Sequence, residues 1–423
     1  MPTARGWLVG LAGTALIGAG VLFGSRSLWQ VGVALIALAA VAVGVVRSGR
    51  HRVTVTRRVT PERARPGQPV TVSIDVVNGG SRAAPLLLLE ERLPAGLVGG
   101  NRFALRGIEA GGRRDASLTL RAAHRGRYWV GPMEVSIVDP FCLARARSVA
   151  VGRTSFLVHP GAEQLALPRT AGDRRSSALS ALRQPTGARG EDFYTLREYV
   201  EGDDLRKIHW TSTAKSGRYM IRQEETPWQT RATLLVDDRG AVHDGWGGQS
   251  SFERAVEAAA SLVDLYQSSG YSYRLVGAHE SGVPSGRHAE HHRRCLDLLA
   301  TIAPARAAGE SALATRIAEL ERSPTAEAVL VVVTGTLSSG DALAFTRCTR
   351  RFGEVTVICF PAHRFSGQTT RLRWEGETRL VEAMRMLTRA GIRALALGPD
   401  ERLSPAWSSL SPARAREVVW GRN

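Results

Sequence analysis

The sequence predicts a multi-domain protein: an N-terminal transmembrane helical hairpin, an antiparallel β-sandwich, and an α/β domain with a doubly wound parallel sheet. Three observations support this fold class. Two uncharged apolar runs open the chain, alternating apolar residues follow up to about residue 159, and strand and helix patterns alternate beyond residue 218. The length of 423 residues also exceeds what one hydrophobic core usually organises.

The helical hairpin is expected within residues 1–50. Residues 7–23 and 28–46 carry no charged side chain, and each run is about long enough to cross the hydrocarbon core of a bilayer. Only GSRS separates them, so the two helices should run antiparallel. Small residues allow the helices to approach closely. They are Gly13, Gly18, Gly20, Gly32 and Ala34.

Basic residues around the hairpin predict its orientation. Arg5 and Arg26 flank the first helix, whereas a denser group follows the second: Arg47, Arg50, Arg52, Arg57 and Arg58. Such a group stays cytoplasmic and attracts anionic lipid, so we expect the lipid bilayer as a partner, with the N-terminus and the soluble domains in the cytoplasm. A cleaved signal peptide is the alternative for the first segment, and the second helix would then still keep the rest of the chain cytoplasmic.

Composition excludes some function classes. The net charge is +17, but acidic residues are interleaved with the basic ones, and neither an RNP motif nor zinc-finger spacing occurs, so no nucleic acid is expected. The four cysteines contain no CxxC pair, which favours free thiols over disulfides or structural zinc. They are Cys142, Cys295, Cys348 and Cys359.

Residues 51–159 are predicted to form the β-sandwich. Apolar residues alternate along RVTVTRRVT, PVTVSIDVVN, PLLLLEERL, DASLTLRAA and GRYWVGPMEVSIV, with turn signals between the runs. We expect nothing catalytic in this domain. Residues 160–189 are rich in Gly, Pro, Ser and Arg and are predicted to be an irregular linker.

Residues 218–423 are predicted to form the α/β domain, in which ligands usually bind at the carboxyl ends of the strands. Two such ends are Asp237-Asp238-Arg239-Gly240 and Thr334-Gly335-Thr336. Neither GxGxxG nor a P-loop is present, so no cofactor is expected. His288, His291 and His292 have helical spacing, but without a further ligand nearby they favour a solvated helix face over a metal site.

Between linker and α/β domain lies a densely charged segment, residues 190–217, which contains GEDFYTLREYVEGDDLRKIHW. A short helix is expected to begin near Asp203 or Asp204, which are good N-caps, and to end at Gly217. Trp210 is expected to pack as an apolar anchor near the domain junction. The residues predicted to form a joint or partner surface are Glu191, Arg197, Glu198, Tyr199, Gly202, Asp203, Asp204, Arg206, His209 and Trp210.

Three interpretations of this segment compete: a structural joint or partner surface, a ligand or peptide site, and a catalytic site. In a structural joint, Arg197 and Arg206 form forked pairs with neighbouring carboxylates. In a catalytic site, His209 forms a dyad with Asp203 or Asp204, and Ser212 or Thr213 serves as nucleophile. The joint is favoured, because residues within about two turns of one helix cannot readily surround a substrate. We therefore predict that the protein is not an enzyme.

Two motifs carry a resemblance to a known family. RGRYWVGPMEVSIVDPFCL at 125–143 is similar to R-G-x-Y-x-x-G-P…D-P-F-G-L, and GEDFYTLREYVEGDDLRKIHW is similar to G-x-E-F-x-x-L-R-E-Y-x-x-G-D-D-x-R-x-I-x-W. Both are found in the bacterial membrane proteins of domain-of-unknown-function family 58, which the chain resembles along nearly its whole length. Cys142 stands where the family usually has Gly, which should slightly change the turn after Asp139-Pro140.

The resemblance implies a last domain similar to von Willebrand factor A domains, which often bind Mg²⁺ through D-x-S-x-S with a later Thr and Asp. In the matching run from Asp237, Arg239 and Ala241 replace both serines, and Thr334-Gly335-Thr336 stands where an Asp is expected. A guanidinium opposes a cation, so the metal site should be lost and no metal is expected. This weakens a third alternative, a metal-dependent adhesion module.

The resemblance also implies partners, namely a MoxR-type AAA+ ATPase and a transglutaminase-like membrane protein. It favours a scaffold or adaptor at the bacterial cytoplasmic membrane that acts in assembly or maintenance of the envelope or of protein complexes. The alternative is a hydrolase or ligand-binding enzyme that uses residues 190–217.

Overall fold

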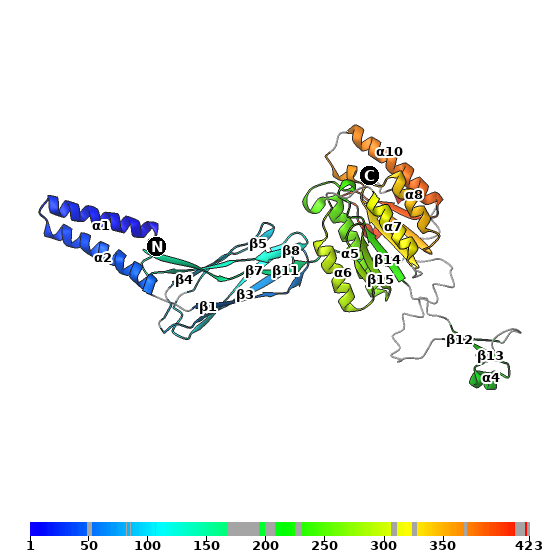
Figure 1. The fold of residues 1–423 in the computed structure, drawn as a ribbon, viewed down its shortest axis with the longest axis horizontal. Coiled ribbons are helices and arrows are strands. Elements are labelled where there is room, and N and C mark those ends of the chain that lie inside the picture. The colour runs from blue at the N-terminus through cyan, green and yellow to red at the C-terminus, as the bar shows by residue number, and fades with distance from the viewer. Residues whose placement is uncertain are drawn as a thin grey trace. The chain divides into compact units, whose positions relative to one another are not determined.

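The structure is a computed structural model (Figure 1). It describes residues 1–48, 53–81, 83–84, 86–105, 107–167, 194–198, 208–224, 231–305, 311–323, 328–367, 370–410 and 419–420. The chain divides into two compact units, Met1–Gly161 with Leu299–Thr301, and Ala162–Leu298 with Ile302–Asn423.

The first unit opens with two helices, α1 (Ala4–Leu22) and α2 (Arg26–Ser48). Both are long and apolar enough to cross a membrane, by length and composition. They touch through backbone: a Cβ on Gly13 would lie 2.9 Å from the carbonyl oxygen of Gly32, and one on Gly20 would lie 2.7 Å from the nitrogen of Trp29. The expectation for Gly18 and Ala34 is wrong, because Gly18 has no neighbour within 4 Å and Ala34 is exposed.

Two antiparallel four-stranded sheets follow, as the alternating pattern predicts, with the orders β1-β3-β7-β5 and β10-β9-β4-β6. A smaller sheet with the order β2-β11-β8 is mixed, because β11 pairs parallel with β2 and antiparallel with β8. The strands are β1 (Val53–Thr60), β2 (Arg63–Ala64), β3 (Pro69–Asn78), β4 (Leu86–Glu91), β5 (Leu97–Gly99), β6 (Arg102–Leu105), β7 (Arg113–Ala122), β8 (Gly126–Val130), β9 (Met133–Val138), β10 (Arg145–Val151) and β11 (Thr154–Val158).

Both four-stranded sheets contribute to one core. Val72 and Ile74 of β3 and Leu87 and Leu89 of β4 are buried in the same hydrophobic cluster. A fully buried ion pair also connects the sheets, because Arg57 lies on β1 and Glu91 ends β4. Burial raises the pKa of the Glu91 carboxyl, although the nearby Arg57 opposes this shift.

The second unit contains a seven-stranded sheet with the order β16-β15-β14-β17-β18-β19-β20. Its strands are β14 (Arg231–Val236), β15 (Ser272–Gly277), β16 (Val283–Gly286), β17 (Val329–Thr334), β18 (Glu354–Cys359), β19 (Arg393–Ala396) and β20 (Val419–Trp420). Every pairing is parallel except that of β16 with β15.

The sheet is therefore mixed, whereas the sequence predicted a parallel one. Gly282 allows the tight return to β16, because its φ is +79° and a Cβ there would lie 2.2 Å from the carbonyl oxygen of Leu275. The edge strand that follows has only four residues, VPSG, and this composition predicts no strand.

Helices cover both faces of this sheet. They are α5 (Ser251–Ser268), α6 (Ala289–Thr301), α7 (Ser311–Arg322), α8 (Ser339–Cys348), α9 (Ala362–Phe365), α10 (Thr370–Arg389) and α11 (Leu403–Ser408), with short 3₁₀ turns at Gly240–Val242 and Gly247–Gln249. Residues of α7, α8 and α10 share one core cluster with the strands, and α5 lies across the sheet from them (Figure 1).

The start of the predicted linker is fastened to this domain. The Glu163 carboxylate accepts hydrogen bonds from the backbone N–H groups of Leu403 and Ser404, at 3.1 and 2.9 Å. The indole of Trp407 donates to the carbonyl oxygen of Ala166 at 2.9 Å. Residues 168–189 of the linker lie outside the described part of the chain.

Candidate functional site

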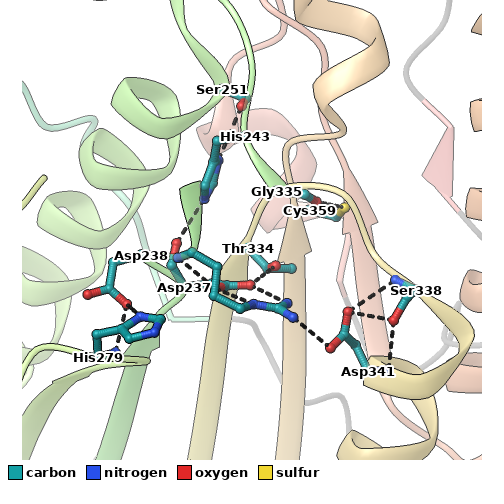
Figure 2. Close-up of polar contacts among 11 residues, drawn as sticks. Asp237, Asp238, His243, Ser251, His279, Thr334, Gly335, Ser338, Asp341 and Cys359 are labelled. Carbon is teal, nitrogen blue, oxygen red and sulfur yellow. Dashed lines mark hydrogen bonds and ion pairs between the residues drawn. The ribbon is translucent and has the colours of Figure 1, made fainter. Parts of the chain in front are cut away.

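The carboxyl edge of the sheet gathers the candidate residues. β14 and β17 are neighbours, and the strand order reverses between them, which is where α/β sheets usually bind ligands. Asp237 follows β14 and Thr334 ends β17, so both side chains reach the same place (Figure 2). Arg239 joins them through its hydrogen bonds to Asp237. All three residues are buried, and none is more than 3% exposed.

The guanidinium of Arg239 lies between two carboxylates. Its Nε donates to Oδ1 of Asp237 at 2.9 Å and its Nη2 donates to Oδ2 at 2.7 Å, which is a bidentate pair. Its Nη1 lies 3.2 Å from Oδ1 of Asp341. The hydroxyl of Thr334 donates to Oδ2 of Asp237 at 2.7 Å. The position that a cation would need beside Asp237 is thus filled by a side chain.

These contacts fix the charge of Arg239. Burial by itself lowers the pKa of the guanidinium, but the hydrogen bonds and charges of Asp237 and Asp341 more than compensate and raise the pKa above its ordinary value. Arg239 is therefore a permanent internal cation. The fourth position singled out in the sequence, Ala241, is exposed in the first 3₁₀ turn and does not join the network.

Asp341 was missed by the sequence reasoning. It lies in the first turn of α8, where its Oδ2 accepts the hydroxyl of the N-cap residue Ser338 at 2.7 Å in a capping box. Its other oxygen faces Arg239. The S-x-x-D spacing directly after a buried strand was the available signal, because a capping box there starts a helix at the edge of the sheet.

His243 contacts the backbone of Asp237 and so supports the site. Its Nε2 lies 2.8 Å from the carbonyl oxygen of Asp237 and its Nδ1 lies 3.1 Å from Oγ of Ser251. Burial lowers the pKa of His243, Arg239 lowers it further, and the hydrogen bond to Asp237 opposes the shift only in part. The neutral imidazole thus joins β14 to α5. No local sequence pattern identifies this role.

Asp238 is also used structurally. Its Oδ1 accepts the backbone N–H of His279 at 2.8 Å, with the ring Nδ1 of the same residue at 3.2 Å, and its Oδ2 accepts the N–H of Glu280 at 3.1 Å. The carboxylate therefore holds the turn that follows β15.

One loop at this edge carries an exposed aromatic side chain. Trp246 is 94% exposed between two glycines with positive φ, Gly245 and Gly247. The base of the loop is fixed, because the N–H of Asp244 donates to Oγ of Ser251 and the N–H of Ser251 donates to the carbonyl oxygen of Asp244, both at 2.9 Å. The base of the loop is thus hydrogen-bonded, and its indole lies in solvent.

The densely charged segment is described only in part. Strand β12 (Tyr194–Glu198) pairs antiparallel with β13 (Met220–Glu224), which places Arg197 opposite Ile221 and Glu198 opposite Met220. The other predicted joint residues lie outside the described part of the chain. They are Glu191, Tyr199, Gly202, Asp203, Asp204 and Arg206.

Two expectations for this segment are corrected. The helix α4 (Trp210–Ser216) begins at Trp210 with His209 as its N-cap, and not near Asp203, because the backbone at His209 is extended. Trp210 is 66% exposed and is no buried anchor. Instead, the backbone N–H of His209 and the side chain of Thr213 bind Met220 of β13, at 2.8 and 3.0 Å.

The histidine that caps α4 also contacts a hydroxyl. The ring Nδ1 of His209 lies 2.9 Å from Oγ of Ser212 and accepts the N–H of Ser212 at 3.3 Å. The structure thus assembles the serine–histidine contact of the catalytic interpretation. The same geometry is expected of an N-cap, which accepts an N–H from the first turn.

Among the described residues, no group of three or more His, Cys, Asp or Glu could hold a metal ion. His288, His291 and His292 have separate roles. His288 occupies the N-cap position of α6 without a capping hydrogen bond from its side chain. The ring of His291 packs against Tyr273, and Nε2 of His292 lies 3.2 Å from Oδ1 of Asp264.

Comparisons with known proteins agree with one of the two motifs. The family described as "Protein of unknown function DUF58" matches residues 195–359. An uncharacterized protein of Mycobacterium tuberculosis (Rv1480) and one of Mycobacterium bovis (Mb1516) are each 27% identical to the chain over 165 residues, or 38% of this chain. The chain covers 52% of the length of these relatives.

Similarity to solved structures is low. The CARDB domain of the PF1109 protein from Pyrococcus furiosus has 11% identity and a TM-score of 0.19, and it covers 26% of this chain and 91% of its own. The FixG-related protein from Vibrio parahaemolyticus has 12% identity and a TM-score of 0.17, and it covers 25% of this chain and 94% of its own. These values assign neither a fold nor a function.

Proposed function

We propose that the protein is a membrane-anchored scaffold of the bacterial cytoplasmic membrane, without enzymatic activity, whose cytoplasmic α/β domain docks other proteins. Its partners in this proposal are a MoxR-type AAA+ ATPase and a transglutaminase-like membrane protein. One observation carries the proposal: the guanidinium of Arg239 lies between Asp237 and Asp341, at the edge of the sheet where a ligand or metal would otherwise bind.

The sheet order supports assigning the last domain to the von Willebrand factor A-like class. The parallel strands reverse their order at β14 and β17, and the edge strand β16 is antiparallel. Asp237 then occupies the position of the metal-binding aspartate, and Arg239 takes the place of the cation. A domain of this kind binds partners through its surface and needs no metal to do so.

Trp246 is our candidate for the central contact. Tryptophan is enriched among residues that dominate binding energy, and this one is held at the carboxyl edge by a fixed loop. Burying the indole against a partner requires little ordering of the loop, since its base is already hydrogen-bonded to Ser251.

Co-purification of the full chain with the co-expressed ATPase from native membranes tests this proposal. Trp246→Ala should lower the recovered ATPase at least about tenfold, the effect of about 1.4 kcal/mol in binding free energy. Trp374→Ala is the control, because Trp374 is a second exposed tryptophan of the same domain, 69% exposed on α10, and its loss should change nothing. Equal recovery of the ATPase with wild type, Trp246→Ala and Trp374→Ala would refute docking through Trp246.

The hydrolase alternative has one observation in its favour, the contact between Ser212 and His209. It predicts that a fluorophosphonate probe labels Ser212 and that His209→Ala abolishes labelling. The scaffold predicts no labelling of wild type, and His209→Ala then only weakens the start of α4. Labelling that depends on both residues would overturn the non-enzymatic proposal.

A further inference from the structure

The N-terminus of the chain is paired with a turn of the β-domain. The N-terminal ammonium of Met1 donates to the carbonyl oxygen of Arg145 at 2.7 Å. The N–H of Thr3 donates to the carbonyl oxygen of Leu143 at 2.8 Å. Pro2 forms an antiparallel bridge with Ala144. The turn between β9 and β10, Asp139–Leu143, therefore lies directly at the start of α1.

The Asp139–Leu143 turn is rigid. The buried Asp139 carboxylate accepts the N–H of Ala144 through Oδ1 and that of Phe141 through Oδ2, at 2.5 and 2.9 Å, and its carbonyl oxygen accepts the N–H of Cys142. Cys142 has φ of +59°, the conformation that the glycine expected here would adopt most easily. Cys142 thus adopts a left-handed conformation within a turn that the Asp139 carboxylate holds.

The same turn contacts both helices at one end of the hairpin. Leu143 and Ala144 are buried in a cluster with Ala42 and Val46, near the end of α2. On the other helix, Gly6 lies so close that a Cβ would be 2.1 Å from the carbonyl oxygen of Leu143. Contacts at the first turn of α1 and the last turns of α2 place the turn level with the end of both apolar helices.

Phe141 points away from this packed base. It is 64% exposed, although its own backbone N–H is held by Asp139. One turn into α1, Trp7 is also 64% exposed. The charged residues at this end include the exposed Arg5 and Arg147. Exposed aromatic rings beside basic residues at the end of an apolar helix are typical of the membrane–water interface.

We propose that the Asp139–Leu143 turn seats the β-domain on the membrane, with the Phe141 ring inserted into the interface of an anionic bilayer. This inference rests on the proposed function, in which α1 and α2 span that bilayer. The bilayer is the occupant because the turn continues the surface of the two helices without a gap, as the contacts of Gly6, Leu143 and Ala144 require. The seat fixes the angle at which the β-domain leaves the membrane.

Nitroxide labelling of the full chain in vesicles of phosphatidylethanolamine and phosphatidylglycerol tests the seat. The background is Cys142→Gly, which removes the half-buried thiol and leaves three buried ones. A label at Phe141→Cys should collide several-fold more with oxygen than with a water-soluble nickel chelate. The control is Val98→Cys on β5, where the side chain is 73% exposed. At position 98, collisions with the nickel chelate should exceed those with oxygen.

A second pair of variants keeps the test independent of the label. Gly6→Ala should push the turn from α1 and raise the access of nickel chelate to position 141, whereas Gly10→Ala, with no neighbour within 4 Å, should leave it unchanged. Replacing phosphatidylglycerol by a zwitterionic lipid should lower the immersion of the label, since Arg5 and Arg147 then lose their counter-charges.

The outcomes separate this inference from the proposal on which it rests. If the chain resists extraction by alkaline carbonate but the label at 141 is as water-accessible as that at 98, the seat is refuted and the anchor stands. If carbonate releases the chain, membrane anchoring itself is refuted. Protection at 141 that needs a second protein and not lipid would assign the surface to that protein and refute the seat.

Discussion

Two buried arginines of this protein solve the same electrostatic problem differently. Among the described residues, Glu91 is the one carboxylate that pairs with Arg57 in the β-domain, and burial raises the pKa of that glutamate. Arg239 in the α/β domain lies between Asp237 and Asp341, and its own pKa is raised. One charged partner barely compensates Glu91 for its lost hydration, whereas two carboxylates more than compensate Arg239 and stabilise its charged form. The Arg57–Glu91 pair joins two sheets, whereas the Arg239 network fills the position beside Asp237 that a cation would need.

The largest effect should come from Arg239→Ala. Two carboxylates in the interior then lack their cation, and the α/β domain should lose about 3 to 5 kcal/mol of its free energy of unfolding. Chemical unfolding monitored within that domain measures the loss. Arg293→Ala is the control, because its pair with Glu290 is exposed and should contribute less than about 1 kcal/mol.

The same variant shows whether Arg239 replaces a metal. Millimolar Mg²⁺ should restore part of the stability of Arg239→Ala, since carboxylate and hydroxyl oxygens suit this cation, and should leave wild type unchanged. If Mg²⁺ stabilised wild type as much as the variant, Arg239 would not occupy the cation position.

A smaller effect is expected from Arg57→Met, which leaves one carboxylate unpaired and should cost about 3 kcal/mol near neutral pH. The folded-state pKa of Glu91 already lies above its ordinary value, so the folded state binds a proton there more readily than the unfolded state. The difference between wild type and variant should therefore shrink as the pH falls, because protonated Glu91 needs no cation. Unfolding curves at several pH values give this difference.

The double variant Arg57→Met with Glu91→Leu separates charge from packing. Replacing both partners by apolar side chains removes the unpaired charge, so most of the stability should return. A double variant as unstable as Arg57→Met would mean that Arg57 acts mainly through its other bonds, to Thr154 and to the carbonyl oxygen of Gly152.

The smallest effect concerns His243, which holds the rear of the Arg239 network. Its pKa is lowered in the folded state, so on acidification below about pH 6.5 the unfolded chain takes up the proton first, and the α/β domain loses stability. His243→Gln retains a donor toward Asp237 and does not titrate, so its stability should fall less over the same interval. Equal slopes for the two proteins would show that His243 does not titrate in this way.

The sequence predicted the elements with a strong period and missed those that depend on contacts between distant residues. Charge-free runs and alternating residues identify the helices and the β-domain, because burial on one face leaves a local pattern. The antiparallel strand β16 has no such pattern, since Gly282 and a short edge produce it.

The site was predictable to a similar degree. Asp237, Arg239 and Thr334 follow from strand ends, which meet at one edge in any parallel arrangement. Asp341 required recognising a capping box, and His243 required knowing that β14 and α5 meet. Trp210 was misjudged because residue size was taken as evidence of burial, whereas the position of α4 against β13 leaves that ring in solvent.

Because its cation is covalently attached, the site at the carboxyl edge of the sheet keeps this positive charge whatever the supply of metal ions. A site that binds magnesium reversibly depends on the supply of the ion. A partner bound through that ion dissociates when the ion does. Arg239 cannot diffuse away. If other proteins dock on this domain as we propose, their affinity does not depend on ion supply, and their release has to be driven by the partner. For the ATPase of that proposal, ATP hydrolysis would supply the energy for release.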